Sequence, residues 1–406
     1  MNFDRYIKNK IVGPTHSFLF KTPSGFKDEV KAEIDASLSM LGLSASVSVV
    51  ERGAAVESLK ISEALKLAML IKGASDVLIL AGSYKSAHES DLSKIDYIKL
   101  SALLGGAKQI ACVLRGYSRV STPDFHTKLQ NKISENGLSL TISSKESKYD
   151  TYLESVYENG KHSIYLSLTG FGLNQRGFKE ALYAKAPIRE DLAYNLIEYG
   201  FKCFEKIYTP ETILVPFLGS ATFIYEYALY KSGSPNLNYE SWFVSNTAYS
   251  QVKSLAHFSK DREFKCSSKF IGIDIDSKAI ESARKNHQKF SELYGDIDIE
   301  LKLEDVLSTL PTLKEAFKAY NGKLYLPLNP PWGERLGGKE LAQKLYKGAL
   351  KLICALKDAD ITGFLLCPNE QLWSFSSNYL TREGFKLHTK HFTQGGKHLR
   401  ALYFKK

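Results

Sequence analysis

The chain has 406 residues, of which 44% are hydrophobic and 24% are charged, and its net charge is +10. This length and composition indicate a globular protein of two or three domains, and the positive charge favours a polyanionic partner. No apolar run approaches the roughly 18 residues that a transmembrane helix needs, and Lys8 and Lys10 precede any stretch that could act as a secretory signal. The five widely spaced cysteines argue against a zinc site or a disulfide frame. We therefore expect a cytoplasmic protein that needs no membrane, whose oligomeric state the sequence leaves open.

The first part of the chain predicts two successive α+β regions. Residues 1–58 contain a strand over 17–20, a helix over 26–41 and a returning strand over 46–50. Residues 59–173 continue with helices over 61–69, 91–104 and 124–134 and with strands over 76–80, 109–114 and 163–168. Neither region carries a glycine pattern for nucleotide binding.

Basic residues alternate with aromatic residues in the second region and shortly after it. Cations that contact phosphate and rings that stack on bases would together suit RNA, although a solvated basic surface explains the same pattern. The residues that we assign to RNA binding are Arg115, Arg119, Lys128, Arg176 and Lys179.

The third part, residues 174–406, alternates strands and helices as a doubly wound parallel sheet requires. A strand over 213–217 leads through the tight turn 218–220 into a helix over 222–229. Such a turn brings backbone N–H groups and a helix N-terminus close to a ligand, so we take Pro216, Gly219 and Ser220 as candidate cofactor residues. A plain strand-to-helix connection is the alternative for this segment alone.

Two acidic positions follow the next two strands. The strand that begins at 270 ends at Asp274, and a helix begins at Ser277. A carboxylate at this point is placed to accept hydrogen bonds from ribose hydroxyls, whereas Asp276 is placed to cap the helix. Asp305 ends the following strand, where it could meet an adenine amino group or could be an exposed loop acid.

Four residues form a candidate clamp after a strand over 323–328: Asn329, Pro330, Pro331 and Trp332. The prolines fix φ and remove backbone donors, so the turn presents acceptors, and the indole offers a face on which a base can stack. An ordinary turn at a strand end is the alternative. A helix over 341–356, a strand over 361–366 and a hairpin of 386–392 with 398–404 complete the expected fold.

The run 329–337 resembles the Asn-Pro-Pro-Tyr-Gly-Glu-Arg-Leu-Gly run of THUMP-domain methyltransferases, specifically the RlmL-like group that methylates guanine N2 in large-subunit ribosomal RNA. Segments 168–170, 175–179, 186–193 and 274–280, with Tyr239 and Trp242, are similar too. The resemblance implies a ferredoxin-like region (1–58), a THUMP RNA-binding domain (59–173) and a Rossmann-like class I domain (174–406) that uses S-adenosylmethionine.

The resemblance also implies roles for the clamp. The Asn329 side chain and the Pro330 carbonyl would hold an exocyclic base amino group toward the methyl donor, with the base unpaired or flipped out against Trp332. Pro331 completes the set of candidate catalytic residues. Neither a metal nor a covalent nucleophile is required.

Two positions depart from the family pattern. Val215 stands where the family has aspartate, and Ala221 stands where it has the last glycine of the cofactor turn, so we expect weaker cofactor binding, with a methyl group that crowds the turn. Three hypotheses follow: guanine-N2 methylation of ribosomal RNA, the same chemistry on transfer RNA or on an adenine amino group, and an RNA-binding protein with a decayed methyltransferase domain. A dinucleotide oxidoreductase fits poorly, because the glycine fingerprint is incomplete.

Overall fold

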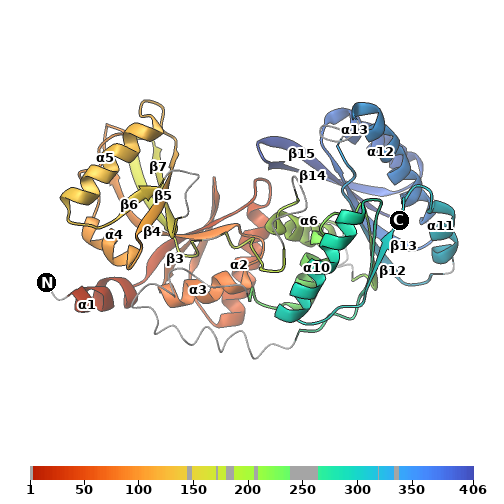
Figure 1. Cartoon of the computed structure of the whole chain (residues 1–406), viewed down its shortest axis with the longest axis horizontal. Helices are drawn as coiled ribbons and strands as arrows, with labels where there is room; N and C mark the ends of the chain where they lie inside the picture. Colours follow the sequence, from red (N-terminus) through yellow and green to blue (C-terminus); the bar gives the residue numbers. More distant parts are fainter. Residues whose placement is uncertain are drawn as a thin grey trace. The chain divides into compact units, whose positions relative to one another are not determined.

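The computed structural model describes residues 3–143, 149–170, 172–179, 187–204, 209–237, 264–318, 320–332 and 338–406. The chain divides into two compact units, and Figure 1 shows the order of their elements. Among the described residues, those within 1–22 and 30–175 belong to the first unit, and those within 23–29, 176–237 and 264–406 belong to the second. No helix in the described ranges is long and apolar enough to cross a membrane.

The first unit carries a mixed sheet with the strand order β2-β3-β1-β4-β8-β7-β5-β6. Its strands are β1 (His16–Lys21), β2 (Ser46–Val50), β3 (Gly53–Leu59), β4 (Asp76–Lys85), β5 (Gln109–Arg115), β6 (Thr141–Ser143), β7 (Thr151–Glu158) and β8 (Lys161–Ser167). Its helical elements are α1 (Phe3–Tyr6), the π-helix η1 (Ile7–Val12), α2 (Lys27–Leu41), α3 (Ile61–Leu70), α4 (Tyr97–Leu104) and α5 (Thr122–Glu135). One core joins Phe18 and Phe20 of β1 to Ile34 of α2 and Leu65 of α3.

This sheet runs without a break through the strands of residues 1–58 and those of residues 59–173. The division of this part into a ferredoxin-like region and a THUMP domain stays a prediction. The helix predicted over 91–104 begins only at Tyr97, because the Asp96 side chain caps it by accepting a hydrogen bond from the Lys99 N–H. Asp91 instead forms a turn in which it accepts a hydrogen bond from the Ser93 N–H.

The second unit carries a sheet with the order β11-β10-β9-β12-β13-β15-β14. Its strands are β9 (Thr212–Pro216), β10 (Lys269–Asp274), β11 (Ile299–Leu303), β12 (Lys323–Leu328), β13 (Asp360–Cys367), β14 (Lys386–Gln394) and β15 (Lys397–Lys405). Its helices are α6 (Glu190–Lys202), α7 (Thr222–Ser232), α10 (Ser277–Leu293), α11 (Leu310–Lys318), α12 (Gly338–Ala355) and α13 (Glu370–Arg382). Strands β9 to β13 pair in parallel, and the predicted hairpin β14–β15 pairs antiparallel.

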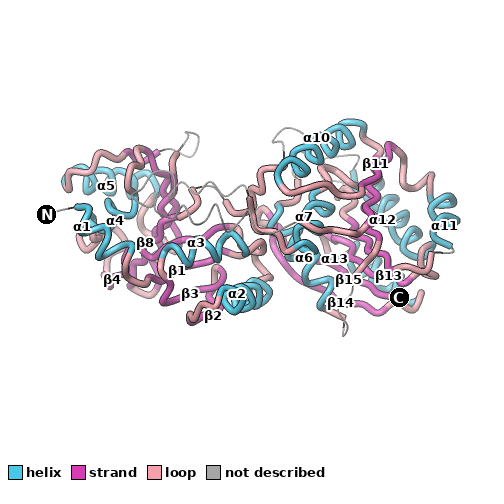
Figure 2. The backbone as a smooth tube through the Cα atoms, turned by 90° about the horizontal axis from the view of Figure 1, so that it is seen from below, coloured by secondary structure: helices cyan, strands magenta, loops and turns pink. Residues whose placement is uncertain are grey.

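Two hydrophobic cores cover the two faces of this sheet. One core includes side chains of α6, α7 and α10, and the other includes side chains of α11, α12 and α13. Figure 2 shows the backbone of these helices around the strands of the sheet. The strand order changes direction between β9 and β12, which are paired neighbours. In open α/β sheets, ligands bind at the carboxyl ends of the strands at this switch point.

A short N-terminal segment belongs to the second unit. Phe26 is completely buried in its core, and the Phe26 and Phe392 rings lie 5.9 Å apart between centroids. The Lys390 ammonium group lies 2.5 Å from Glu29 Oε1 and 4.7 Å from the centre of the Tyr199 ring. Residues from distant parts of the sequence therefore close this core.

Candidate active site

The turn after β9 is held by backbone hydrogen bonds. The Leu218 N–H donates to the Ile273 carbonyl at 3.0 Å, and the Ala221 N–H donates to the Leu218 carbonyl at 3.0 Å. Gly219 has a φ of +55°, and a Cβ added there would meet no atom within 4 Å. The backbone at Gly219 therefore faces open space at the switch point, beside the N-terminus of α7.

Asp274 ends β10 and is tied directly to this turn. Its Oδ2 atom accepts a hydrogen bond from the Gly219 N–H at 2.8 Å, and its Oδ1 atom accepts one from the Asp276 N–H at 3.0 Å. Each carboxylate oxygen has a further lone pair for a ligand hydroxyl. Asp276 caps α10, as predicted, by accepting a hydrogen bond from the Lys278 N–H at 2.9 Å. The backbone thus fixes the orientation of Asp274 before any ligand binds.

Asp305 lies exposed after β11. Its Oδ1 atom accepts a hydrogen bond from the Leu307 N–H at 3.0 Å, which shapes the turn. Two exposed apolar side chains that sequence reasoning missed lie at the same edge: Ile275 is 71% exposed and Leu303 is 54% exposed. Leu303 is the register partner of Asp274. The sequence did contain a signal for Ile275, because it is a large apolar residue directly after the acid that ends a strand. An acid and an apolar side chain at this place could both contact a flat ring.

The other predicted cofactor residues contribute structure. Pro216 is buried in β9, and the buried Ser220 hydroxyl lies 3.1 Å from the Thr222 hydroxyl. The Ser220 carbonyl accepts a hydrogen bond at 3.0 Å from Asn286 of α10, another residue that sequence reasoning missed. These contacts stabilise the conformation of the turn.

The two positions that depart from the family pattern are both buried. Val215 and Ala221 belong to the core that includes α7 and α10, so the Ala221 methyl group packs inside the protein. The expectation that this methyl group crowds a ligand is therefore wrong. The cost of Ala221 lies in its backbone, which has a φ of +60°, and Phe217 has a φ of +63°. Non-glycine residues rarely adopt this left-handed conformation, so strain is concentrated in this turn.

The clamp follows β12 directly. Pro330 is buried, Asn329 and Trp332 are half-buried, and the indole packs against the core. The Trp332 indole N–H donates a hydrogen bond to Asn329 Oδ1 at 3.2 Å. Trp332 therefore orients the Asn329 amide, in addition to any contact that its ring makes with a base. The rest of the motif, residues 333–337, lies outside the described residues, as do Tyr239 and Trp242.

The predicted RNA-binding residues fall into two groups. Arg119 and Lys128 are exposed, and Arg115 is 55% exposed with its Nε atom 3.4 Å from Glu154 Oε1. Arg176 is 1% exposed, and its guanidinium donates to both carboxylate oxygens of Glu226.

Lys179 is half-buried, and its ammonium group also has partners within the protein. It donates a hydrogen bond to the Ile188 carbonyl at 2.8 Å and lies 3.4 Å from Glu190 Oε1. Because burial and these partners keep Arg176 and Lys179 from a phosphate, we correct their assignment from RNA binding to structural support.

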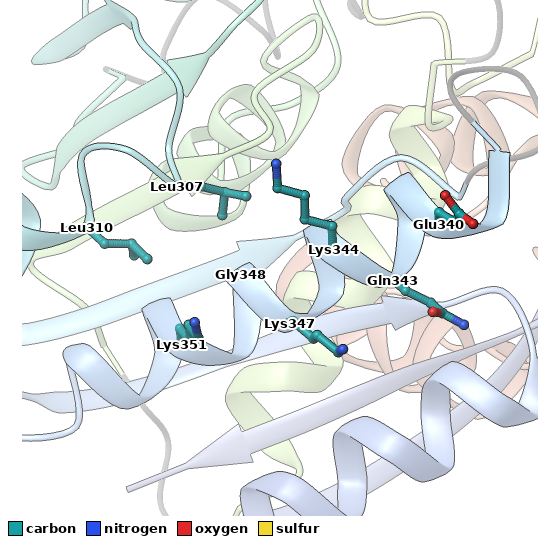
Figure 3. Close-up of a pocket in the computed structure, with 8 residues that line it drawn as sticks. All are labelled: Leu307, Leu310, Glu340, Gln343, Lys344, Lys347, Gly348 and Lys351. Carbon is teal, nitrogen blue, oxygen red and sulfur yellow. The ribbon is translucent and has the colours of Figure 1, made fainter.

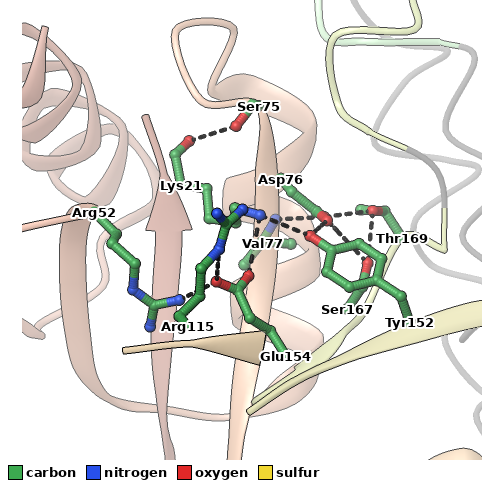
Figure 4. Close-up of polar contacts among 10 residues, drawn as sticks. All are labelled: Lys21, Arg52, Ser75, Asp76, Val77, Arg115, Tyr152, Glu154, Ser167 and Thr169. Carbon is green, nitrogen blue, oxygen red and sulfur yellow. Dashed lines mark hydrogen bonds and ion pairs between the residues drawn. The ribbon is translucent and has the colours of Figure 1, made fainter. Parts of the chain in front are cut away.

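Sequence reasoning also missed Glu154, which lies completely buried among three cations in the first unit (Figure 4). Lys21 approaches Glu154 Oε2 at 3.1 Å, and Arg52 and Arg115 approach Oε1. Burial raises the pKa of Glu154, but the three cations outweigh burial, so the net pKa is lowered. Next to it, burial raises the pKa of Asp76, although that carboxylate accepts hydrogen bonds from several hydroxyls.

Most of the candidate site lies within a segment that matches a known protein family. Residues 176–359 match the family described as RMKL-like, methyltransferase domain. This segment is therefore similar to RMKL-like methyltransferase domains. Its match includes the turn after β9, Asp274, Asp305 and the clamp.

One protein to which this chain is similar is the ribosomal RNA large subunit methyltransferase K/L of Shewanella frigidimarina. It is 31% identical over 267 residues, an alignment that covers 60% of this chain and 34% of that protein. The matched region thus spans about a third of the length of the curated relatives.

Two solved structures share the fold of nearly the whole chain. A possible methylase from Clostridium difficile 630 has a TM-score of 0.71 at 19% identity and covers 96% of this chain and 98% of its own. SMU.472, named as a methyltransferase and solved with SAH, has a TM-score of 0.69 at 19% identity and covers 97% of this chain and 98% of its own. The expected α/β architecture with a Rossmann-like class I domain is confirmed.

Proposed function

We propose that this chain is an S-adenosylmethionine-dependent RNA methyltransferase that modifies an exocyclic base amino group, guanine N2 in large-subunit ribosomal RNA. One observation carries the proposal: the clamp at the end of β12 follows the strand that pairs with β9, whose own end forms the candidate cofactor turn. A methyl donor and an acceptor amino group need this adjacency, because positioning supplies most of the rate gain in such a reaction.

The residues at the switch point fit S-adenosylmethionine. Open space above Gly219 accommodates the ligand against the backbone, Asp274 offers acceptors for ribose hydroxyls, and exposed Ile275 offers an apolar contact for adenine. Asp305 remains our candidate for the adenine amino group. When bound, this cofactor supplies a methyl group on a positively charged sulfur.

The clamp acts by orientation. A base amino group has its lone pair delocalised into the ring, so it must be held with the lone pair toward the methyl carbon. The Asn329 side chain and the Pro330 carbonyl accept its two N–H bonds, and Trp332 steadies the amide. None of the four clamp residues is titratable, so the clamp itself does not accept the proton that the amino group releases.

The turn geometry favours an active enzyme over a decayed one. Ala221 adopts the left-handed conformation that a glycine would adopt, so the turn keeps its shape despite the substitution. A turn without function would be under no pressure to retain two strained non-glycine residues.

The choice of ribosomal RNA rests on the name of the curated relatives, whose proteins this chain covers only in part. Guanine N2 rests on the resemblance of the run 329–337. The alternative substrates are transfer RNA and an adenine amino group, and the experiment must distinguish them from guanine N2 of ribosomal RNA.

The test uses the full chain. Calorimetric titration with S-adenosylmethionine should give micromolar binding. Ribosomal RNA from a strain that lacks this protein should then gain N2-methylguanosine on incubation with the chain and cofactor, as detected by nucleoside mass spectrometry. Cofactor binding without methylation of ribosomal RNA, but with methylation of transfer RNA, would reassign the substrate. Absence of cofactor binding would reject the enzyme.

A further inference from the structure

A hollow of about 430 Å³ lies beside α12 in the second unit (Figure 3). Its lining comes from α12, from the segment between β11 and α11, and from the first residue of α11. The lining residues are Leu307, Leu310, Glu340, Gln343, Lys344, Lys347, Gly348 and Lys351. None of the residues that we assign to the cofactor or the clamp belongs to this lining.

Three of the lining residues are lysines at positions that share one side of the helix. Lys344, Lys347 and Lys351 are separated by three and four residues, so their side chains are neighbours on the helix surface. At 1.5 Å per residue they cover about 10 Å along α12. Phosphates of one stacked strand repeat about every 3.4 Å along the axis, so the row matches a short stretch of nucleic-acid backbone.

Among the described residues, these lysines carry positive charge that no ion pair neutralises. In the described ranges none of the three ammonium groups forms an ion pair, and all three side chains are exposed. Other surface lysines of the same unit are paired: Lys285 lies 3.0 Å from Glu281, and Lys302 lies 3.1 Å from Glu300. Glu340 is the one carboxylate of the lining.

The floor of the hollow depends on a glycine. A Cβ on Gly348 would lie 2.1 Å from Leu307 Cδ2, so only glycine lets this leucine lie against the middle of α12. Leu307 is also the residue whose N–H binds Asp305. The hollow therefore adjoins the carboxyl edge of the sheet, and α12 itself follows the clamp segment in the chain.

We propose that this hollow binds phosphate groups of the RNA strand that carries the target base. The inference rests on the proposed function, and it adds a backbone contact on the methyltransferase unit. Lysine side chains bind such phosphates as point charges, and the apolar floor allows the lysine stems to pack while their ammonium groups reach outward. Phosphate contacts of this kind position a strand without reading its sequence.

The test compares two triple variants of the full chain. K344Q/K347Q/K351Q removes the row, and K285Q/K289Q/K302Q removes three positive charges from α10 and β11 of the same unit. Binding of a fluorescent single-stranded RNA is measured by anisotropy over a series of salt concentrations. Three lost contacts should flatten the slope of log K against log salt by about 2 and weaken binding roughly tenfold, whereas the control changes both much less.

A free anion is tested separately by calorimetry with inorganic tripolyphosphate. Equal RNA binding by the two triple variants would overturn the proposal, and so would loss of tripolyphosphate binding without loss of RNA binding. S-adenosylmethionine binding is also measured in each protein, so that failure of the phosphate site can be told apart from failure of the proposed methyl transfer. If the wild type binds RNA through this row but transfers no methyl group, the phosphate site stands and the proposed reaction fails.

Discussion

In the proposed reaction, Asn329 combines two hydrogen-bonding tasks in one side chain. Its Oδ1 atom accepts the Trp332 indole N–H and has a second lone pair for a substrate amino group. Trp332 therefore limits the rotation of the amide, which is the kind of preorganisation that positioning catalysis needs. The identity of the residue that follows the two prolines thus matters for more than stacking.

We predict that Asn329→Ala lowers kcat/KM for methyl transfer about 100-fold, because a misplaced amino group loses its alignment. Trp332→Phe keeps a stacking face and loses only the N–H bond, so it should cost about fivefold, the equivalent of about 1 kcal/mol. Both rates are measured with radiolabelled cofactor on the same RNA. Cofactor dissociation constants serve as the control and should match the wild type. A wild-type rate in Asn329→Ala would remove the clamp from the mechanism.

Glu154 gives the first unit a pH dependence. Its net pKa is lowered in the folded protein, so its contribution to stability is present above the unfolded pKa of about 4.3. That contribution is lost as the pH falls through the lower folded pKa. Acid should therefore weaken the first unit by releasing Lys21, Arg52 and Arg115 from their shared partner.

We predict that Glu154→Gln lowers the free energy of unfolding by about 2 kcal/mol at neutral pH, since it leaves partly buried cations without a counter-charge. The loss should shrink as the pH falls through the lowered folded pKa of Glu154, because the wild-type carboxylate then becomes protonated too. Urea denaturation between pH 3 and 7 measures both effects. Glu158→Gln, on the exposed end of the same strand β7, is the matched control, and an equal effect of the two variants would contradict the assignment.

At the scale of elements, α7 offers a comparison between its two ends. Gly219, before the helix, has a φ of +55°, and Gly233, after it, has a φ of +62°. A Cβ added to either residue meets no atom within 4 Å. The two glycines therefore share a left-handed backbone and free space around the Cα atom. They differ in position, because Gly219 lies in the candidate cofactor turn and Gly233 lies at the opposite end of α7.

We predict that Gly219→Ala and Gly233→Ala each lower the free energy of unfolding by about 1 kcal/mol, the cost of a left-handed non-glycine residue. Only Gly219→Ala should weaken S-adenosylmethionine binding, by roughly tenfold, because its methyl group enters the space that we assign to the ligand. Calorimetry and thermal denaturation measure the two effects. Equal cofactor affinity in both variants would mean that the ligand lies elsewhere.

The same turn shows what sequence reasoning could reach. The strand, the glycine and the acid at Asp274 were predictable, because each follows from local rules: apolar strands, tight turns and polar residues at strand ends. The clamp was predictable for a similar reason, since Pro330 and Pro331 restrict their own backbone. Local chemistry therefore located most of the candidate site.

Features that depend on distant partners were not predictable. Arg176 looks like a surface cation until Glu226, fifty residues later, pairs with it in the core. Strand β7 was missed because it buries the carboxylate of Glu154, which breaks the alternation of apolar and polar residues. The exposure of Ile275 likewise follows from the packing of the whole sheet.

For the whole molecule, the net charge of +10 should make the proposed binding of RNA sensitive to salt. Part of the positive charge is held internally by Glu154 and Glu226, so the exposed cations decide the interaction. Arg119 and Lys128 remain our candidates in the first unit, because the structure leaves both side chains exposed.

We predict that R119Q/K128Q reduces the slope of log K against log salt by about 1.4, for two lost single-strand phosphate contacts. K8Q/K10Q removes the same charge from the exposed π-helix η1 and should leave the slope nearly unchanged. Filter binding of RNA across a salt series measures both variants. If the two double variants behave alike, the first unit contributes only diffuse charge.

The placement of Phe26 affects whether the second unit can fold when it is produced as a separate fragment. A fragment that starts at Arg176 contains the whole family match but lacks the ring that covers Phe392 and the carboxylate that pairs with Lys390. Such a fragment would expose apolar surface on its last two strands and would tend to aggregate. A truncation at the start of the family match would therefore remove residues that belong to the hydrophobic core of the second unit. A viable excised unit would have to carry a graft of residues 23–29.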